Sequence, residues 1–283
     1  MTKATADGAA APRPTPTVVI EAKGGAMEWL ELWRFRDLFV ILAERDIRLR
    51  YRQTALGVVW VILQPLAASL IFAAIFGLFA KLPSEGTPYL LFVFAAMLPW
   101  NLFSGGVQRG GNSLIGNTGL ITKIYFPRPI IPIASVSAVL LDFAVASLVM
   151  LVLMFLYGSP VTWTIVALPV LIVITLAITV GVSLLFSALS VYYRDFSAVL
   201  PFLLQIWLYG TPVVYASSLV PERWRALYGL NPLVGVVDGF RWALLGAPPP
   251  MITLPESAVI GLLILLVGAA VFKRVERSFA DVI

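Results

Sequence analysis

The chain has few side chains that could carry covalent chemistry. Its 283 residues include no histidine and no cysteine. This excludes histidine-based acid–base catalysis, thiolate nucleophiles and metal sites built from these ligands. The fifteen acidic residues do not cluster, since seven precede residue 50 and the others are scattered. A catalytic carboxylate pair therefore has no support, and we expect no metal site.

Asp142 is the acidic residue that stands out, because it lies inside the apolar stretch Ile130–Tyr157. A carboxylate within a membrane is costly and by default indicates a function such as a proton or ion relay. The other apolar stretches offer it no charged partner, and a single acidic residue without a partner makes a poor relay. Asp142 could equally lie near the inner third of the bilayer, hydrogen-bonded to a neighbouring helix.

Four aromatic residues lie near the expected outer ends of apolar stretches: Trp100, Trp207, Tyr209 and Tyr215. Flat aromatic faces can stack on sugar rings, so these residues could line a substrate path. Aromatic belts at the membrane–water interface are the other explanation. The periodicity does not decide between the two.

The chain also lacks the means to hydrolyse ATP through a phosphate-binding loop. No G-x-x-x-x-G-K-[ST] sequence occurs in it. Any ATP-driven role would need ATP and Mg²⁺ on a separate subunit. We expect no cofactor and no enzymatic activity in this chain.

Composition indicates that lipid surrounds the elements that position these residues. Hydrophobic residues make up 60% of the chain and charged residues only 12%, whereas a soluble domain carries about 25% charged residues. The net charge is +5, but the arginines flank apolar stretches. Membrane topology and anionic lipid account for such arginines, so we do not expect nucleic-acid binding.

Six apolar stretches predict an all-α integral membrane protein with six transmembrane helices. At 1.5 Å per residue, about 20 residues cross a hydrocarbon core of about 30 Å. The last stretch, Ser257–Phe272, has 16 residues and is barely long enough. The expected spans are 57–80, 88–107, 131–157, 164–192, 197–215 and 255–272.

The basic residues predict that both termini lie in the cytoplasm. With the N-terminus inside, sixteen Lys and Arg residues fall on inner segments and four on outer segments. The outer four are Lys81, Arg223, Arg225 and Arg241. An excess of this size on one side is the pattern of cytoplasmic segments.

Beside the spans, the sequence predicts a disordered tail and an amphipathic helix. Residues 1–26 are rich in Ala, Thr and Pro without an apolar period and form the tail. Residues 27–283 form a single transmembrane domain. At its start, residues 28–52 place arginines on one side of a helix and Phe35, Phe39 and Leu49 on the other. Such a helix lies in the membrane interface, or packs as a soluble helix on a partner.

Two further non-spanning segments are expected. Residues 110–122 are polar and turn-rich, and Ser113–Leu120 could form a short docking helix on the inner surface or a simple loop. Residues 217–250 contain proline, tryptophan and tyrosine. We expect two short helices there, at 221–229 and 233–245, in a re-entrant or interfacial hairpin on the outer face.

The sequence resembles the membrane subunits of polysaccharide-exporting ABC transporters, the exporters of O-antigen, capsule and teichoic acid. Residues 45–60 are similar to the pattern R-D-x-x-x-R-Y-x-x-(S/T)-x-L-G-x-x-W that opens these subunits. The resemblance covers about residues 28–283. Its further parts, in family order, are Gln64-Pro65, Tyr193-Arg194-Asp195, Thr211–Tyr215, Asn231-Pro232-Leu233 and Arg241-Trp242.

The resemblance implies a homodimer in the inner (cytoplasmic) membrane, with twelve spans around a central channel and two copies of a separate ATP-binding subunit. The cargo would be a polysaccharide on polyprenyl pyrophosphate, like the O-antigen of lipopolysaccharide, passing an aromatic-lined channel. Residues 28–52 would be the interface helix, and 217–250 would close the outer end. The helix that couples to the ATPase would contain Ser113, Leu114, Asn117 and Leu120.

The arginines of the first motif would lie where the pyrophosphate headgroup enters from the inner leaflet: Arg45, Arg48, Arg50 and Arg52. Guanidinium groups bind phosphate through two parallel hydrogen bonds. These arginines could equally do no more than set the topology.

Three other functions are compatible with parts of the sequence. One is a short type-2 ABC permease for a drug or lipid, since the sequence does not state the cargo. Another is an ion-coupled secondary transporter that uses Asp142, although no repeated halves are visible. The third, a membrane glycosyltransferase, would need carboxylates grouped on one membrane face.

Overall fold

The computed structural model describes residues 29–51, 57–121, 126–193, 195–276 and 279. The predicted tail and Arg52 lie outside these residues. Within them the secondary structure is helical and contains no strand, as the sequence predicts. The α-helices are α1 (Trp29–Arg34), α2 (Arg36–Tyr51), α3 (Gly57–Phe72), α4 (Tyr89–Gly116), α5 (Thr118–Ile121), α6 (Ile130–Ser137), α7 (Val139–Leu156), α8 (Leu168–Tyr192), α9 (Asp195–Tyr209), α10 (Glu222–Gly229), α11 (Leu233–Leu245) and α12 (Thr253–Glu276). A π-helical segment, Ala73–Phe79, extends α3, and 3₁₀ turns cover Trp163–Ala167 and Ser217–Leu219.

Five helical stretches of the described chain are long and apolar enough to cross a membrane. They are Val59–Phe79, Tyr89–Gly116, Ile130–Leu156, Trp163–Tyr192 and Thr253–Glu276. The last contains the expected sixth span and has 24 residues. The prediction that this span is barely long enough to cross the membrane was therefore wrong. Its helix begins before the uncharged run and continues through Lys273 and Arg274.

The expected fifth span is the short one. Its helix, α9, has 15 residues and is therefore about 22 Å long. The apolar run continues to Tyr215, but Gly210 and Pro212 end the helix. Glycine favours irregular backbone, and proline lacks the N–H that a helix needs. Residues 210–216 are a non-helical strap instead.

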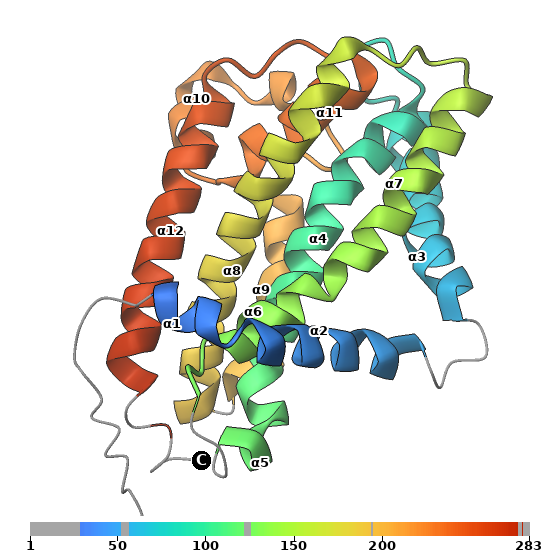
Figure 1. Cartoon of the computed structure of the whole chain (residues 1–283). Coiled ribbons are helices and arrows are strands. Elements are labelled where there is room, and N and C mark those ends of the chain that lie inside the picture. The colour runs from blue at the N-terminus through green and yellow to red at the C-terminus, as the bar shows by residue number, and fades with distance from the viewer. Residues whose placement is uncertain (1–28, 52–56, 122–125, 194, 277–278, 280–283) are drawn as a thin grey trace, which may run out of the picture.

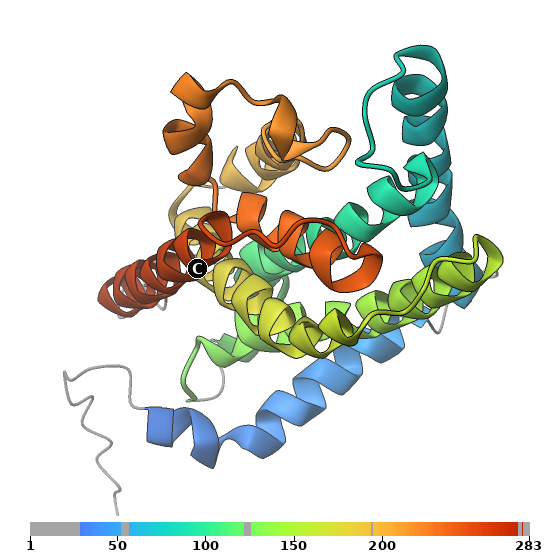
Figure 2. The same ribbon diagram turned by 90° about the horizontal axis from the view of Figure 1, so that it is seen from above.

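The long helices run side by side, and α2 lies across them at one end (Figure 1). The helices α10 and α11 lie at the opposite end. Both ends of the described chain lie near the end where α2 and α5 are found. Viewed end-on, α4 and α8 occupy the middle, with α3, α7 and α12 toward the periphery (Figure 2).

Small residues allow α8 to pack tightly against both α4 and α12. A Cβ atom at Gly106 of α4 would lie 2.4 Å from Cγ2 of Thr179 on α8. A Cβ atom at Gly268 of α12 would lie 2.3 Å from the carbonyl oxygen of Gly181. Helices in lipid associate through such close backbone contact, because the hydrophobic effect does not drive them together.

Candidate functional site

The helix α2 packs against the bundle through one side. Leu42 is buried, and Phe35 and Phe39 pack with it against a cluster that includes Leu114 and Ile131. The opposite side exposes Val40 and Ile41. Leu49, predicted on the apolar side, is 67% exposed. The amphipathic pattern therefore describes the first three turns of the helix but not its end.

The arginines of α2 have different partners. Arg48 lies 2.5 Å from Glu44, and both side chains are exposed. Arg45 lies 2.9 Å from Asp46 on the same helix. Arg50 instead lies 2.5 Å from Asp142 of α7. The three described arginines of the predicted headgroup entry therefore each have a different acidic partner.

Asp142 has two partners, both at the C-terminal end of α2. Besides Arg50, the hydroxyl of Tyr51 donates a hydrogen bond of 2.6 Å to Oδ1 of Asp142. Burial, and then the hydrogen bond to Asp142, raise the pKa of Tyr51 to about 12, so this hydroxyl stays protonated. In the sequence, none of the other expected spans contains a charged residue that could pair with Asp142. Its counter-ion comes from α2, and only the tertiary fold brings the two together.

A second acidic residue fixes the same helix. Oδ2 of Asp46 accepts a hydrogen bond of 2.8 Å from Ser135 of α6. Together with the Arg50–Asp142 ion pair, this bond ties α2 to both α6 and α7, which form the single helical stretch Ile130–Leu156. The crosswise position of α2 therefore rests on polar contacts at one end and apolar contacts at the other.

Arg50 and Asp142 line a cavity of about 500 Å³ between α3, α4 and α7. Much of its wall is apolar, including Val61, Leu98 and Phe143. The other polar residues in the wall are Gln64, Asn101, Ser104, Gln108 and Arg109. A polar cavity within a membrane domain is a default candidate for a binding site or pathway.

A shallow, open depression adjoins this cavity. Arg50 and Arg109 line both the cavity and the depression, and Asp46, Asn112 and Ser135 line only the depression. Arg109 comes from α4 and forms no ion pair among the described residues. In the sequence this arginine was one of the sixteen basic residues that predict the topology, with no other role. An arginine that follows an uncharged stretch was the one signal that could have marked it.

The expected coupling helix does not form as a separate unit. The helix α4 continues through Gly116, so Ser113 and Leu114 belong to it and are 5% and 0% exposed. Leu114 packs in the cluster beneath α2, and Ser113 donates a hydrogen bond to the Gly110 carbonyl. These two side chains cannot contact another subunit directly. The half-buried Asn117 and Leu120 lie at the tip, where α5 follows.

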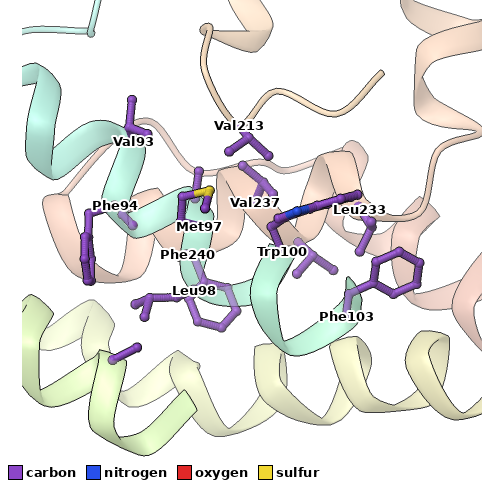
Figure 3. Packing of buried hydrophobic residues seen from close by; sticks show 14 of the residues in the cluster. Val93, Phe94, Met97, Leu98, Trp100, Phe103, Val213, Leu233, Val237 and Phe240 are labelled. Atoms are coloured by element: carbon purple, nitrogen blue, oxygen red, sulfur yellow. The ribbon is translucent and has the colours of Figure 1, made fainter. Parts of the chain in front are cut away.

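The four predicted aromatic residues have different surroundings. Trp100 is 5% exposed and packs near Leu233 and Val237 of α11 (Figure 3). Its side chain is part of the core, because α11 covers this part of α4. Tyr209 is 56% exposed, and its carbonyl accepts a hydrogen bond from the hydroxyl of Tyr215.

Trp207 belongs to the junction between α9 and α11. Its indole N–H donates a hydrogen bond of 3.0 Å to Oδ1 of Asn231. The amide nitrogen of Asn231 donates to the carbonyl of Gly210, also at 3.0 Å. The Asn231-Pro232 motif therefore fixes the end of α9 against the start of α11.

The two short helices expected in 217–250 are present as α10 and α11. A buried arginine of α11, Arg241, holds this helix against its neighbours. Arg241 is 2% exposed, and its guanidinium lies 3.5 Å from the centre of the Phe92 ring. It donates hydrogen bonds to the carbonyls of Val213, at 2.9 Å, and Tyr215, at 3.4 Å, and contacts Asp238 at 3.5 Å. No structural role for Arg241 was expected from the sequence. Its spacing of three from Asp238 inside an apolar helix could have indicated one.

Comparison with known proteins places these features in a family. The ABC-2 type transporter family matches residues 37–245, the segment from α2 through α11. The O-antigen export system permease protein RfbA of Myxococcus xanthus is 30% identical over 257 residues, which cover 89% of this chain and 97% of that protein. The protein of the same name from Klebsiella pneumoniae is 27% identical, over 87% of this chain and 95% of that protein. The polysialic acid transport protein KpsM of Escherichia coli is 25% identical, over 83% of this chain and 92% of that protein.

The family match covers most of the chain and includes each of the polar features described above. The crosswise α2, the cavity with Arg50 and Asp142, and the α9–α11 junction all fall inside it. The chain belongs to the ABC-2 type transporter family.

Proposed function

We propose that this chain is the membrane-spanning permease subunit of an ABC transporter that exports a polysaccharide, and that a separate subunit hydrolyses the ATP. The main support is similarity over almost the whole length of an O-antigen export permease, 97% of that protein. The absence of a phosphate-binding loop in the sequence agrees with a separate ATPase.

ATPase activity tests this proposal. We expect the purified chain to hydrolyse no ATP, and co-expression with its ATP-binding subunit to give a complex that does. Deleting the gene for the chain should remove the polysaccharide from the cell surface, and the wild-type gene should restore it. Unchanged surface polysaccharide in the deletion strain would contradict the polysaccharide cargo and favour a permease for a drug or lipid.

The finer details of the assembly are part of the proposal. Two copies would form the channel in the cytoplasmic membrane, each on one ATP-binding subunit, with α5 near that subunit. Each copy would cross the membrane six times, with α9 as the short crossing. The termini, α2 and α5 would then lie in the cytoplasm, and α10 would lie outside.

Cysteine labelling tests this topology, because the sequence has no native cysteine. We choose two exposed positions, Gly119 in α5 and Arg223 in α10. In intact spheroplasts, a membrane-impermeant thiol reagent should modify Arg223→Cys and leave Gly119→Cys unmodified. Inverted vesicles should give the opposite result. Labelling of both positions from the same side would rule out six crossings with α10 outside.

We further propose that the exported polysaccharide is linked to polyprenyl pyrophosphate. The cavity beside Arg50 and Arg109 supports this, because guanidinium groups bind phosphate well. We do not propose an ion-coupled transporter. Asp142, on which that function would rest, is bound to Arg50 and Tyr51.

A further inference from the structure

Arg128 joins the start of α6 to the end of α12. Its backbone N–H donates a hydrogen bond of 3.0 Å to Oε1 of Glu276, and its guanidinium donates a second one to the carbonyl of Glu276. The guanidinium also lies 5.9 Å from the centre of the Phe279 ring, within the range of a cation–π contact. We call Arg128, Glu276 and Phe279 the clasp.

The two charged residues of the clasp stand at the helix ends that favour their charges. Glu276 is the last residue of α12, where the guanidinium of Arg128 interacts favourably with carbonyls that lack a partner within the helix. Arg128 lies in the turn that leads into α6, because its carbonyl accepts a hydrogen bond from the N–H of Ile131. A carboxylate is stabilised beside such a helix start. Each residue therefore caps the helix of the other.

Phe279 is the apolar part of the clasp. Its side chain is fully buried and packs edge-on against Phe272 of α12, with the ring centres 5.4 Å apart. The ring of Tyr192, the last residue of α8, also contacts it, at 6.4 Å between centres. The clasp therefore brings together the start of α6 and the ends of α8 and α12.

The clasp is continuous with the tip formed by the end of α4 and α5. Phe279 packs in the same buried cluster as Leu114 of α4 and Ile121 of α5. The ends of α8 and α12 lie at the same end of the bundle as this tip (Figure 1). A close-packed interior has low compressibility and transmits strain. Displacement of the tip is therefore passed through this cluster to the clasp.

Beyond the clasp, α8 and α12 are held together by their backbones. A Cβ atom at Gly181 of α8 would lie 2.7 Å from Cα of Leu265 on α12, which adds to the close contact at Gly268. The helix α6 packs mainly on α2, α4 and α8, and the clasp links it directly to α12. Movement that reaches the clasp is therefore shared by the α8–α12 pair.

We propose that the clasp carries movement of the α4–α5 tip into the α8–α12 pair. Arg128, Glu276 and Phe279 are positioning residues, because they act through the helices that they hold. This role rests on the proposed function, which places α5 near the ATP-binding subunit. Without the clasp, ATP hydrolysis continues but moves α8 and α12 less, so that less polysaccharide is exported for each ATP.

A double-mutant cycle on the purified full-length chain tests whether the clasp is one unit. Arg128→Gln removes the guanidinium, and Phe279→Leu removes the ring but keeps an apolar side chain. Each change should lower the melting temperature. The double variant should lose clearly less than the sum of the two shifts, because either change alone already breaks the contact between the two side chains. Shifts that simply add would overturn the clasp.

ATPase activity and surface polysaccharide, each measured per assembled complex, test the role in coupling. We expect Arg128→Gln to keep most of the ATPase activity and to reduce export about fivefold. Arg128→Lys should retain most of the export, because an ammonium group still places a positive charge and N–H donors at the end of α12.

Arg274→Gln is the matched control. It removes a positive charge from an exposed residue in the last turn of α12 and should change neither activity. Wild-type export per complex in Arg128→Gln, or a loss of ATPase activity equal to the loss of export, would overturn the role in coupling. If Arg128→Gln does not assemble, Phe279→Leu takes its place in the same comparison.

Failure of the proposed function would give a different result. The wild-type complex would then hydrolyse no ATP, or deletion of the gene would leave surface polysaccharide unchanged. The double-mutant cycle would still report on the clasp, because it needs only the purified chain. Failure of the coupling role would leave the wild-type activities intact and would appear only as an unchanged ratio of export to ATP hydrolysis in Arg128→Gln.

Discussion

Replacing Arg241 by methionine should strongly destabilise the end of the protein that contains α10 and α11. Arg241 is buried and joins three segments: it contacts Phe92 on α4, Asp238 on its own helix α11, and the carbonyls of Val213 and Tyr215 in the strap after α9. Without its guanidinium, Asp238 keeps Ser217 as a partner, and the two strap carbonyls lose these buried donors. Removing one partner of a buried ion pair costs about 3–5 kcal/mol.

The measurement is the thermal unfolding of the purified protein, followed together with surface polysaccharide in cells. We expect the melting temperature to fall by more than about 5 °C and export to be lost. Arg225→Met is the control, because that side chain is exposed and pairs only with Glu222 at 3.5 Å. Equal melting temperatures for the two variants would show that the buried network contributes little.

Gly268→Ala should separate two helices that now touch through their backbones. The added Cβ would lie 2.3 Å from the carbonyl oxygen of Gly181, far inside van der Waals contact. Backbone atoms cannot rotate away as a side chain can, so α8 and α12 must move apart along the whole crossing. Overpacking in a well-packed interior costs about 1–3 kcal/mol, and more where backbone must shift.

Thermal unfolding also checks this prediction, with Gly119→Ala as the matched control. A Cβ atom at Gly119 would meet nothing within 4 Å, and alanine favours a helix over glycine by up to about 1 kcal/mol. We therefore expect the control to be as stable as the wild type or slightly more so. A wild-type melting temperature for Gly268→Ala would mean that the α8–α12 crossing is not tight.

Hydropathy was sufficient to predict an all-helical chain with long apolar helices, because such helices depend on runs of residue type. The five long spans and the two short helices of 217–250 followed from such runs. The predicted ends of two helices were wrong. The helical end of α4 extended past Ser113, since Gly110 and Gly111 do not break a helix that its neighbours bury. At α9, Gly210 and Pro212 ended the helix although the apolar run continued.

The polar contacts could not be predicted, because they join residues far apart in the sequence. Arg50 and Asp142 belong to different motifs, and no spacing rule relates them. Trp100 illustrates the opposite problem: an aromatic residue near a span end looks the same in sequence whether it lines a channel or packs under α11. Only the tertiary arrangement distinguishes these cases.

The shortness of α9 has a consequence for the lipid around it. If this helix crosses the bilayer, its length of about 22 Å leaves about 8 Å of a 30 Å hydrocarbon core unmatched. Lipids beside α9 must then shorten or tilt their chains, at a cost of fractions of a kcal/mol per Å of mismatch. The bilayer would then be locally thinner around α9, and transport would be fastest in bilayers whose short acyl chains make this thinning cost little free energy.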